Sequence, residues 1–172
     1  ISGKALLNLA SSKFISNHNL VDKYMEWISN TPTAKFNGYP YELGMKLKPI
    51  VRTNDTKSKL AKMTIDAQFE NLIKTAKENT GAITGNVWCA LDTSGSMTDP
   101  ISRSSLLTAY DVCISLGIYF STLNEGAFHK NVIMFDNESR VKQLEGTFSE
   151  MYQQIDRSST AWGGTSFISI IK

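Results

Sequence analysis

The stretch VWCALDTSGSM, residues 87–97, decides the fold of this 172-residue chain. Residues 87–91 form a short continuous apolar run, which is typical of a strand buried on both faces of a sheet. The run ends at Asp92, and Ser94 and Ser96 follow at every second position. Ligands of open α/β sheets bind beyond the carboxyl ends of the strands, so the sequence predicts a ligand site at Asp92.

The residues after this stretch alternate between helical and strand patterns. We expect a long apolar helix over 104–123 and a second buried strand over 131–136. An edge strand over 140–144, a helix over 148–156 and a loop over 158–167 should follow. Strands that alternate with helices and are joined by parallel crossovers are typical of α/β domains.

The first half of the chain has helical periodicity instead. Helices are expected over 3–16, 20–29, 41–51 and 59–78, with a loop over 29–42, a polar connection over 52–59 and a break over 78–86. The sequence therefore predicts an α-helical segment over residues 1–80 that precedes an α/β part over residues 86–172.

The two parts differ in charge. Residues 1–80 carry twelve Lys and Arg against seven Asp and Glu, whereas residues 81–172 carry six against nine. The net charge of +2 is too small to indicate a nucleic-acid partner by itself. A solvated, lysine-rich helical face is the simpler interpretation of the basic half, and a binding surface is the alternative.

The cysteines and the apolar runs indicate where in the cell the protein is expected. Cys89 and Cys113 lie in apolar runs without metal-binding spacing, which favours buried, reduced thiols and a cytoplasmic protein. No apolar run reaches 18 residues, so we expect no membrane span. The chain begins without Met or a signal peptide and ends inside an apolar segment, so we expect a fragment of a longer protein.

Asp92, Ser94 and Ser96 supply hard oxygen donors that a tight loop can turn toward one point. Gly95 lets such a loop bend without a Cβ clash. One carboxylate and two hydroxyls suit Mg²⁺, which prefers oxygen ligands and retains several waters. No soft ligand is nearby, which disfavours zinc and copper.

These residues carry a family resemblance. LDTSGSM resembles the metal-ion-dependent adhesion site of von Willebrand factor A domains, whose motif is D-x-S-x-S. That family adds a threonine from a second loop, and WGGTSF at 162–167 supplies one. The resemblance covers 86–172 and implies a Rossmann-like, doubly wound, mostly parallel sheet, here in part. It implies Mg²⁺, or Mn²⁺ or Ca²⁺, on Asp92, Ser94, Ser96 and Thr165.

Two further acidic residues lie near this predicted site. The family supplies another aspartate after a strand that would follow residue 172, so we expect weak metal binding without it. Asp136 also ends a strand and could support the site from behind the metal ligands, and Asp99 lies just past the first loop. An ordinary surface position is the simpler interpretation of both.

The first half narrows the resemblance. AKFNGYPYEL (34–43) and DAQFENLIK (66–74), placed before the predicted strand, are similar to the join in Ro-autoantigen (TROVE-module) proteins and their bacterial, phage and plant relatives. Helical repeats of that family bind small structured RNA through basic surfaces. The resemblance implies RNA contacts, with the aromatics Tyr39 and Tyr41, by Lys46, Lys48, Arg52, Lys57, Lys59 and Lys62.

Three functions follow as hypotheses. The first is a binding module in which the metal bridges to an acidic side chain of a protein partner, as part of a Ro-like RNA-binding ribonucleoprotein. The second is a structural or interaction A domain with a degenerate metal site and no RNA binding. The third, an enzyme, is disfavoured because no general base, phosphate-cradling glycine loop or Ser–His–Asp arrangement is evident.

Overall fold

The computed structural model describes residues 2–10, 12–30, 36–158 and 164–171. The first part consists of the helices α1 (Gly3–Ala10), α2 (Phe14–Asn17), α3 (Val21–Asn30), α4 (Pro40–Leu47), η1 (Lys48–Ile50) and α5 (Thr56–Thr80). The second part consists of β1 (Cys89–Asp92), η2 (Gly95–Thr98), α6 (Ala109–Leu123), η3 (Gly126–Phe128), β2 (Asn131–Phe135), β3 (Ser139–Gln143), α7 (Phe148–Ser158) and α8 (Ile168–Ile171).

The fold is α/β and contains a small mixed sheet in the order β1-β2-β3. β1 and β2 are parallel, with Asp92 opposite Phe135, and β2 and β3 are antiparallel. The parallel register brings the carboxyl ends of β1 and β2 to the same edge of the sheet, which is where the predicted site begins.

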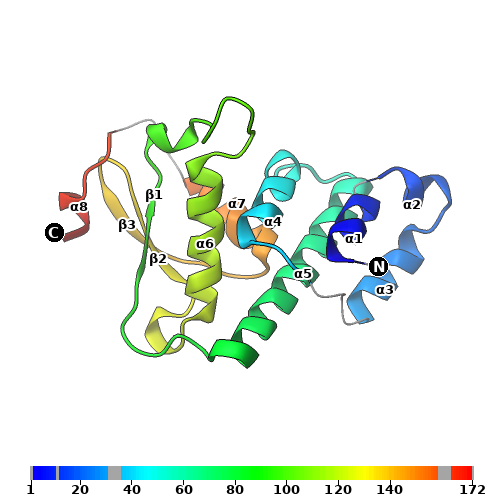
Figure 1. The fold of residues 1–172 in the computed structure, drawn as a ribbon, viewed down its shortest axis with the longest axis horizontal. Coiled ribbons are helices and arrows are strands. Elements are labelled where there is room, and N and C mark those ends of the chain that lie inside the picture. Colours follow the sequence, from blue (N-terminus) through cyan, green and yellow to red (C-terminus); the bar gives the residue numbers. More distant parts are fainter. Residues whose placement is uncertain (1, 11, 31–35, 159–163, 172) are drawn as a thin grey trace.

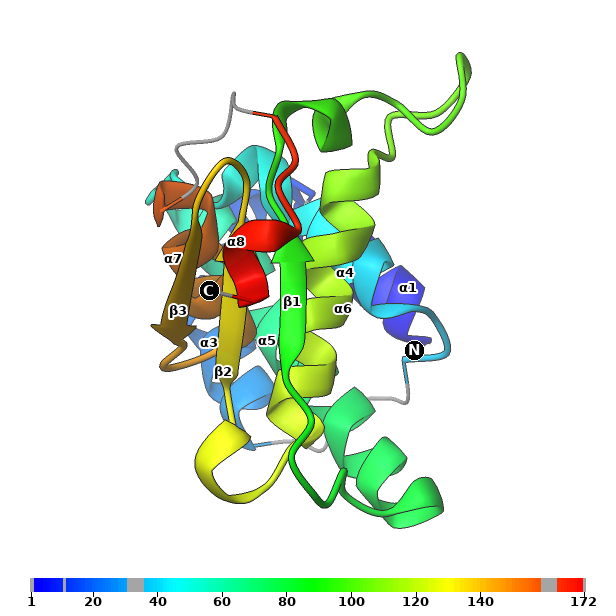
Figure 2. The ribbon, with the colours of Figure 1, turned by 90° about the vertical axis from the view of Figure 1, so that its left-hand side faces the viewer.

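All the described α-helices except α8 lie in layers on one side of the sheet (Figure 1). α6 contacts β1 and β2, α4 and α7 contact α6, and α5 lies behind them with α1 and α3 on its far side. On the opposite face, the short helix α8 lies against the sheet (Figure 2). The expectation that β1 is buried on both faces is therefore wrong: Ala90 is exposed, and Trp88, just before the strand, is 43% exposed.

The hydrophobic core crosses from the first part of the chain into the second. Leu43 of α4 and Phe69 of α5 belong to the same buried cluster as Leu91 of β1 and Ile114 of α6. A second, smaller cluster joins α1, α2 and α3 to the first half of α5. Helices α4 and α5 therefore cover the α/β part, and their apolar faces are buried against it.

Several element boundaries differ from the sequence prediction. The single helix expected over 3–16 is broken into α1 and α2. α5 begins at Thr56, inside the expected connection, because the Asp55 side chain accepts a hydrogen bond from the Ser58 amide at 3.1 Å. α6 begins at Ala109 rather than at 104, because Thr108 and Asp111 form a reciprocal capping box. α4 begins inside the expected 29–42 loop.

Across the described ranges, every helix is too short or too polar to cross a bilayer.

Candidate metal site

Two loops meet beyond the carboxyl ends of β1 and β2. Thr93 anchors the first loop, because its amide and its Oγ1 both donate to the Phe135 carbonyl, at 2.8 and 3.0 Å. The second loop is anchored by the Ser166 amide, which donates to the Asp136 carbonyl at 2.9 Å. These backbone contacts fix both loops to the sheet edge.

The four predicted metal ligands lie together at this edge. The Ser94 amide donates to Oδ1 of Asp92 at 2.9 Å, which turns the loop back on the carboxylate. Ser94 Oγ lies 3.3 Å from Ser96 Oγ, and Thr165 Oγ1 donates to Ser94 Oγ at 3.0 Å. Ser94 is buried, whereas Ser96 and Thr165 are exposed and Asp92 is half-buried. A solvent-facing group of oxygens results.

The donor set fits a small hard cation. An octahedral Mg²⁺ ion with bonds of about 2.0–2.1 Å holds adjacent ligand oxygens roughly 2.9 Å apart. The hydroxyl oxygens of Thr165 and Ser96 lie 3.0 and 3.3 Å from Ser94 Oγ, close to that spacing. The hydrogen bonds among these hydroxyls therefore already hold the oxygens near the separation that a bound cation requires.

Asp136 occupies a different place from the one that its sequence position suggests. It is only 6% exposed, so the simpler expectation of a surface residue is wrong. Its Oδ2 pairs with Arg140 at 2.9 Å, and its Oδ1 accepts from the Glu138 amide at 3.1 Å. Asp136 therefore shapes the β2–β3 turn with its side chain and holds the Thr165 loop with its carbonyl. Asp99 is exposed, as expected.

Cys113 of α6 faces Asp92, a neighbour that sequence reasoning missed. Burial raises the pKa of the Cys113 thiol to about 11; the Asp92 backbone amide opposes this rise, and the Asp92 charge adds to it. The thiol therefore stays protonated at neutral pH, and the donors at this edge remain oxygens. Helical periodicity places Cys113 on the same face of α6 as Ala109. Only the fold shows that this face meets Asp92 of β1.

Three of the six predicted RNA-contacting residues make contacts within the chain. Lys48 pairs with Asp111 at 2.8 Å, and Arg52 pairs with Asp156 at 2.7 Å. Lys62 donates to the carbonyls of residues 51 and 53, at 2.9 and 2.8 Å, and so closes the turn before α5. Lys48 and Arg52 therefore link the first part of the chain to the second, and Lys62 stabilises the turn before α5.

The other three, Lys46, Lys57 and Lys59, are exposed. Lys46 and Lys57 line one groove of about 560 Å³ between α4, α5 and the loop before α6. Tyr39 and Tyr41 stack on each other, with ring centroids 5.5 Å apart and planes 7° apart. Lys48 and Arg52 also keep exposed side chains despite their ion pairs, at 48% and 66%, so five of the six predicted cations are accessible.

Comparison with known proteins finds a family model, of unknown function, that matches the second part of the chain. Residues 87–171 match a family described as "Domain of unknown function (DUF7788)", a range that runs from the start of the VWCAL stretch to the end of α8. No curated protein matches the chain, and no solved structure matches it. Among the described residues, no group of three or more His, Cys, Asp and Glu side chains could hold a metal ion. The candidate metal centre therefore rests on one carboxylate and three hydroxyls.

Proposed function

We propose that this chain is a metal-dependent binding module of the von Willebrand A type, with a partial, doubly wound sheet and a Mg²⁺ site at Asp92, Ser94, Ser96 and Thr165. Mn²⁺ or Ca²⁺ would occupy the same oxygens. The observation that carries the proposal is the 3.0 Å hydrogen bond between Thr165 and Ser94, which joins two distant loops into one donor set.

The donor set also suggests how a partner would bind. A divalent cation held by Asp92 and three neutral hydroxyls keeps a net positive charge, and it attracts a further carboxylate. Ser96 and Thr165 are exposed, so a partner's Asp or Glu side chain can approach from solvent. The bound metal supplies an electrostatic bridge, and the chain supplies a rigid support for it.

Peptide selection tests this function. Displayed peptides are selected on the immobilised chain in Mg²⁺ and eluted with EDTA. We expect the eluted peptides to share an acidic position, to require Mg²⁺ and to lose binding to Asp92→Ala. Asp99→Ala is the matched control, because Asp99 is an exposed carboxylate just past the same loop. Peptide binding that survives both EDTA and Asp92→Ala would contradict the proposal and favour a structural A domain with a degenerate site.

RNA binding is a second candidate, favoured by the exposed Lys46, Lys57 and Lys59 and by the stacked Tyr39 and Tyr41. Three phosphate contacts predict that affinity for a structured RNA hairpin falls roughly 40-fold between 50 and 200 mM salt.

A charge-reversed variant separates the two candidates. Lys57→Glu with Lys59→Glu should abolish RNA binding, whereas Lys23→Glu on α3 and Asp92→Ala should leave it intact. Affinity that does not change with salt would rule out the lysine set as the RNA footprint. The free, partly buried thiols of Cys89 and Cys113 support a cytoplasmic location for either function.

A further inference from the structure

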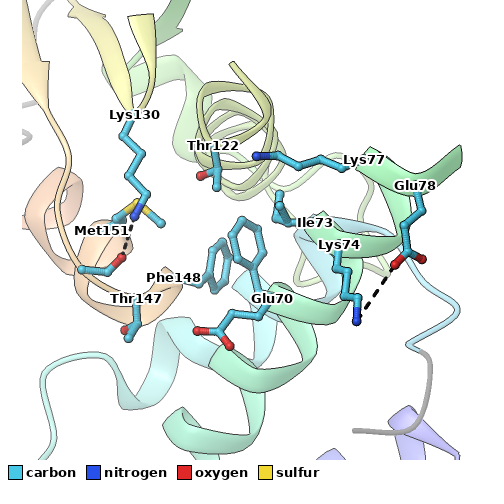
Figure 3. A pocket seen from close by; sticks show the side chains of 12 residues that line it. Glu70, Ile73, Lys74, Lys77, Glu78, Thr122, Lys130, Thr147, Phe148 and Met151 are labelled. Atoms are coloured by element: carbon cyan, nitrogen blue, oxygen red, sulfur yellow. Dashed lines mark hydrogen bonds and ion pairs between the residues drawn. The ribbon is translucent and has the colours of Figure 1, made fainter. Parts of the chain in front are cut away.

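A second cavity lies between α5, α6 and the start of α7, away from the metal-site edge (Figure 3). Its volume is about 510 Å³, within the range of about 300–1,000 Å³ that is typical of small-molecule pockets. Residues from both parts of the chain line it, so it exists only when the helical and α/β parts are joined.

The floor of the cavity is apolar. It is formed by Phe69 and Ile73 of α5 with Phe148 and Met151 of α7. The Phe69 and Phe148 rings stack with their centroids 4.3 Å apart and their planes 22° apart, and both are almost fully buried beneath the cavity. This apolar lining suits the apolar body of a ligand.

Two lysines extend over this floor from opposite sides. Figure 3 shows Lys77 reaching from α5 toward Thr122 of α6, and Lys130 reaching down toward Met151. Lys130 Nζ donates to the Gly146 carbonyl at 3.0 Å, which leaves two of its three N–H donors for other acceptors. The rim thus concentrates positive charge beside the aromatic floor.

Lys130 has a backbone conformation that is unusual for a lysine. It has a φ of 55°, in the left-handed region that glycine or asparagine adopts at lower cost. Its amide donates to the Ser121 carbonyl and its carbonyl accepts from the Leu144 amide, each at 2.8 Å. The fold therefore holds a lysine in a strained conformation that directs its side chain into the cavity.

The acidic residues of the rim lie elsewhere. Glu78 turns outward and pairs with Lys74 at 4.0 Å, and the Glu70 carboxylate lies at the opposite edge of the floor from Lys77 (Figure 3). This separation of charge gives the cavity one cationic end and one anionic end.

We infer that this cavity binds a small amphiphile that has an apolar body and a single anionic group. The apolar body lies on the Phe69–Phe148 floor, and the anion is held between the Lys77 and Lys130 ammonium groups. This site is independent of the metal-site edge, so its success or failure leaves the proposed function untouched.

The test uses decanoate and 1-decanol, which share a chain of ten carbons and differ in charge. Each is titrated into the ¹⁵N-labelled protein at pH 7. We expect decanoate to shift the amides of Thr122, Gly146 and Thr147, and 1-decanol to bind about tenfold more weakly, because its neutral hydroxyl forms no ion pair with the lysines. Equal affinities for the two compounds, shifts outside the cavity, or no shift at millimolar decanoate would each overturn the inference.

Variants separate ligand binding from folding. Lys77→Gln and Lys130→Gly should each weaken decanoate binding about five- to tenfold and leave 1-decanol binding unchanged. Lys130→Gly should keep or raise the melting temperature, because glycine relieves the left-handed strain. Glu70→Gln, the control of opposite sign, should not weaken decanoate binding. A decanoate affinity that Lys77→Gln and Lys130→Gly both leave unchanged would contradict the assignment.

Discussion

Thr165 Oγ1 lies 3.0 Å from Ser94 Oγ, although 71 residues separate the two in sequence. The amide of the next residue, Ser166, is fixed to the Asp136 carbonyl at the end of β2. The contact between the two hydroxyls therefore depends on the β1–β2 pairing, and the candidate metal site is complete only in the folded chain. Metal binding at this edge should stabilise the fold.

Thr165→Val tests the hydroxyl directly, because it keeps the side-chain shape and removes the oxygen. We expect Mn²⁺ affinity, measured by electron paramagnetic resonance, to fall about tenfold or more, since one of four protein ligands is lost. Because the hydrogen bond to Ser94 is lost, the free energy of unfolding without metal should fall by about 0.5–1.5 kcal/mol. Thr84→Val, at an exposed threonine far from the site, should change neither quantity.

Gly44 fixes the crossing of α4 over α6. A Cβ at this position would lie 2.1 Å from Ser115 Oγ, which has no hydrogen-bond partner among the described residues. We expect Gly44→Ala to lower the free energy of unfolding by about 1–3 kcal/mol through overpacking, as measured by urea denaturation.

A double variant tests that cause. Ser115→Ala removes the oxygen that would clash, and the nearest Ser115 atom is then its Cβ, at 3.4 Å. The double variant should therefore recover most of the stability that Gly44→Ala loses. If the two losses simply add, the close approach of α4 to α6 is not the cause.

Asp111 joins three helices. Its side chain is 1% exposed, pairs with Lys48 of η1 at 2.8 Å, accepts from Thr108 at the start of α6 and from the Tyr152 hydroxyl of α7 at 3.4 Å. Asp111→Ala leaves the Thr108 and Tyr152 donors unpaired, while the half-exposed Lys48 turns to solvent, and should cost about 1–3 kcal/mol in unfolding experiments. Asp156→Ala, which breaks the exposed pair with Arg52, should cost less than about 1 kcal/mol. Equal costs would show that Asp111 does not hold the helices together.

Asp66 of α5 caps α7 from outside that helix. Its two oxygens accept from the amide and the hydroxyl of Ser149, both at 2.7 Å. Burial raises the pKa of Asp66 above its ordinary value of 3.8, against the lowering effect of the Ser149 hydrogen bonds. The folded pKa thus exceeds the unfolded one, so ionised Asp66 lowers stability at neutral pH. That penalty is relieved as pH falls toward 3.8.

Asp66→Asn should remove this pH dependence. Relative to Asp66→Asn, the wild type should gain stability between pH 7 and pH 4 in urea denaturation. Asp55 provides a control of opposite sign, because its hydrogen bonds to Ser58 lower its pKa. Relative to Asp55→Asn, the wild type should keep its stability down to about pH 4 and lose it as pH falls below 3.8. A wild-type difference from Asp66→Asn that is constant with pH would contradict the assigned role.

Local patterns predicted most elements of the fold. The apolar runs at β1 and β2 and the polar spacing at Asp92, Ser94 and Ser96 are local, and each was placed from a few adjacent residues. The starts of α5 and α6 are also encoded locally, by Asp55 and by the Thr108–Asp111 capping box. Periodicity alone placed the start of α5 three residues too late and the start of α6 five residues too early.

Long-range packing was not predictable in the same way. Lys48 and Asp111 are 63 residues apart, and Arg52 and Asp156 are 104 apart, so no spacing in the sequence marks them as pairs. Trp88 belongs to an apolar run, yet it lies just before β1 and is 43% exposed. Which face a helix covers depends on tertiary packing, and one-dimensional periodicity carries no information on it.

The most direct test of the metal site is paramagnetic broadening by Mn²⁺ in ¹⁵N-labelled protein. We predict that substoichiometric Mn²⁺ broadens the amide signals of Ser94, Ser96 and Thr165 together, that excess Mg²⁺ restores them, and that Asp92→Ala abolishes the effect while Asp99→Ala preserves it. Broadening that is absent from these three amides, or that persists unchanged in Asp92→Ala, would contradict a metal site at this edge of the sheet.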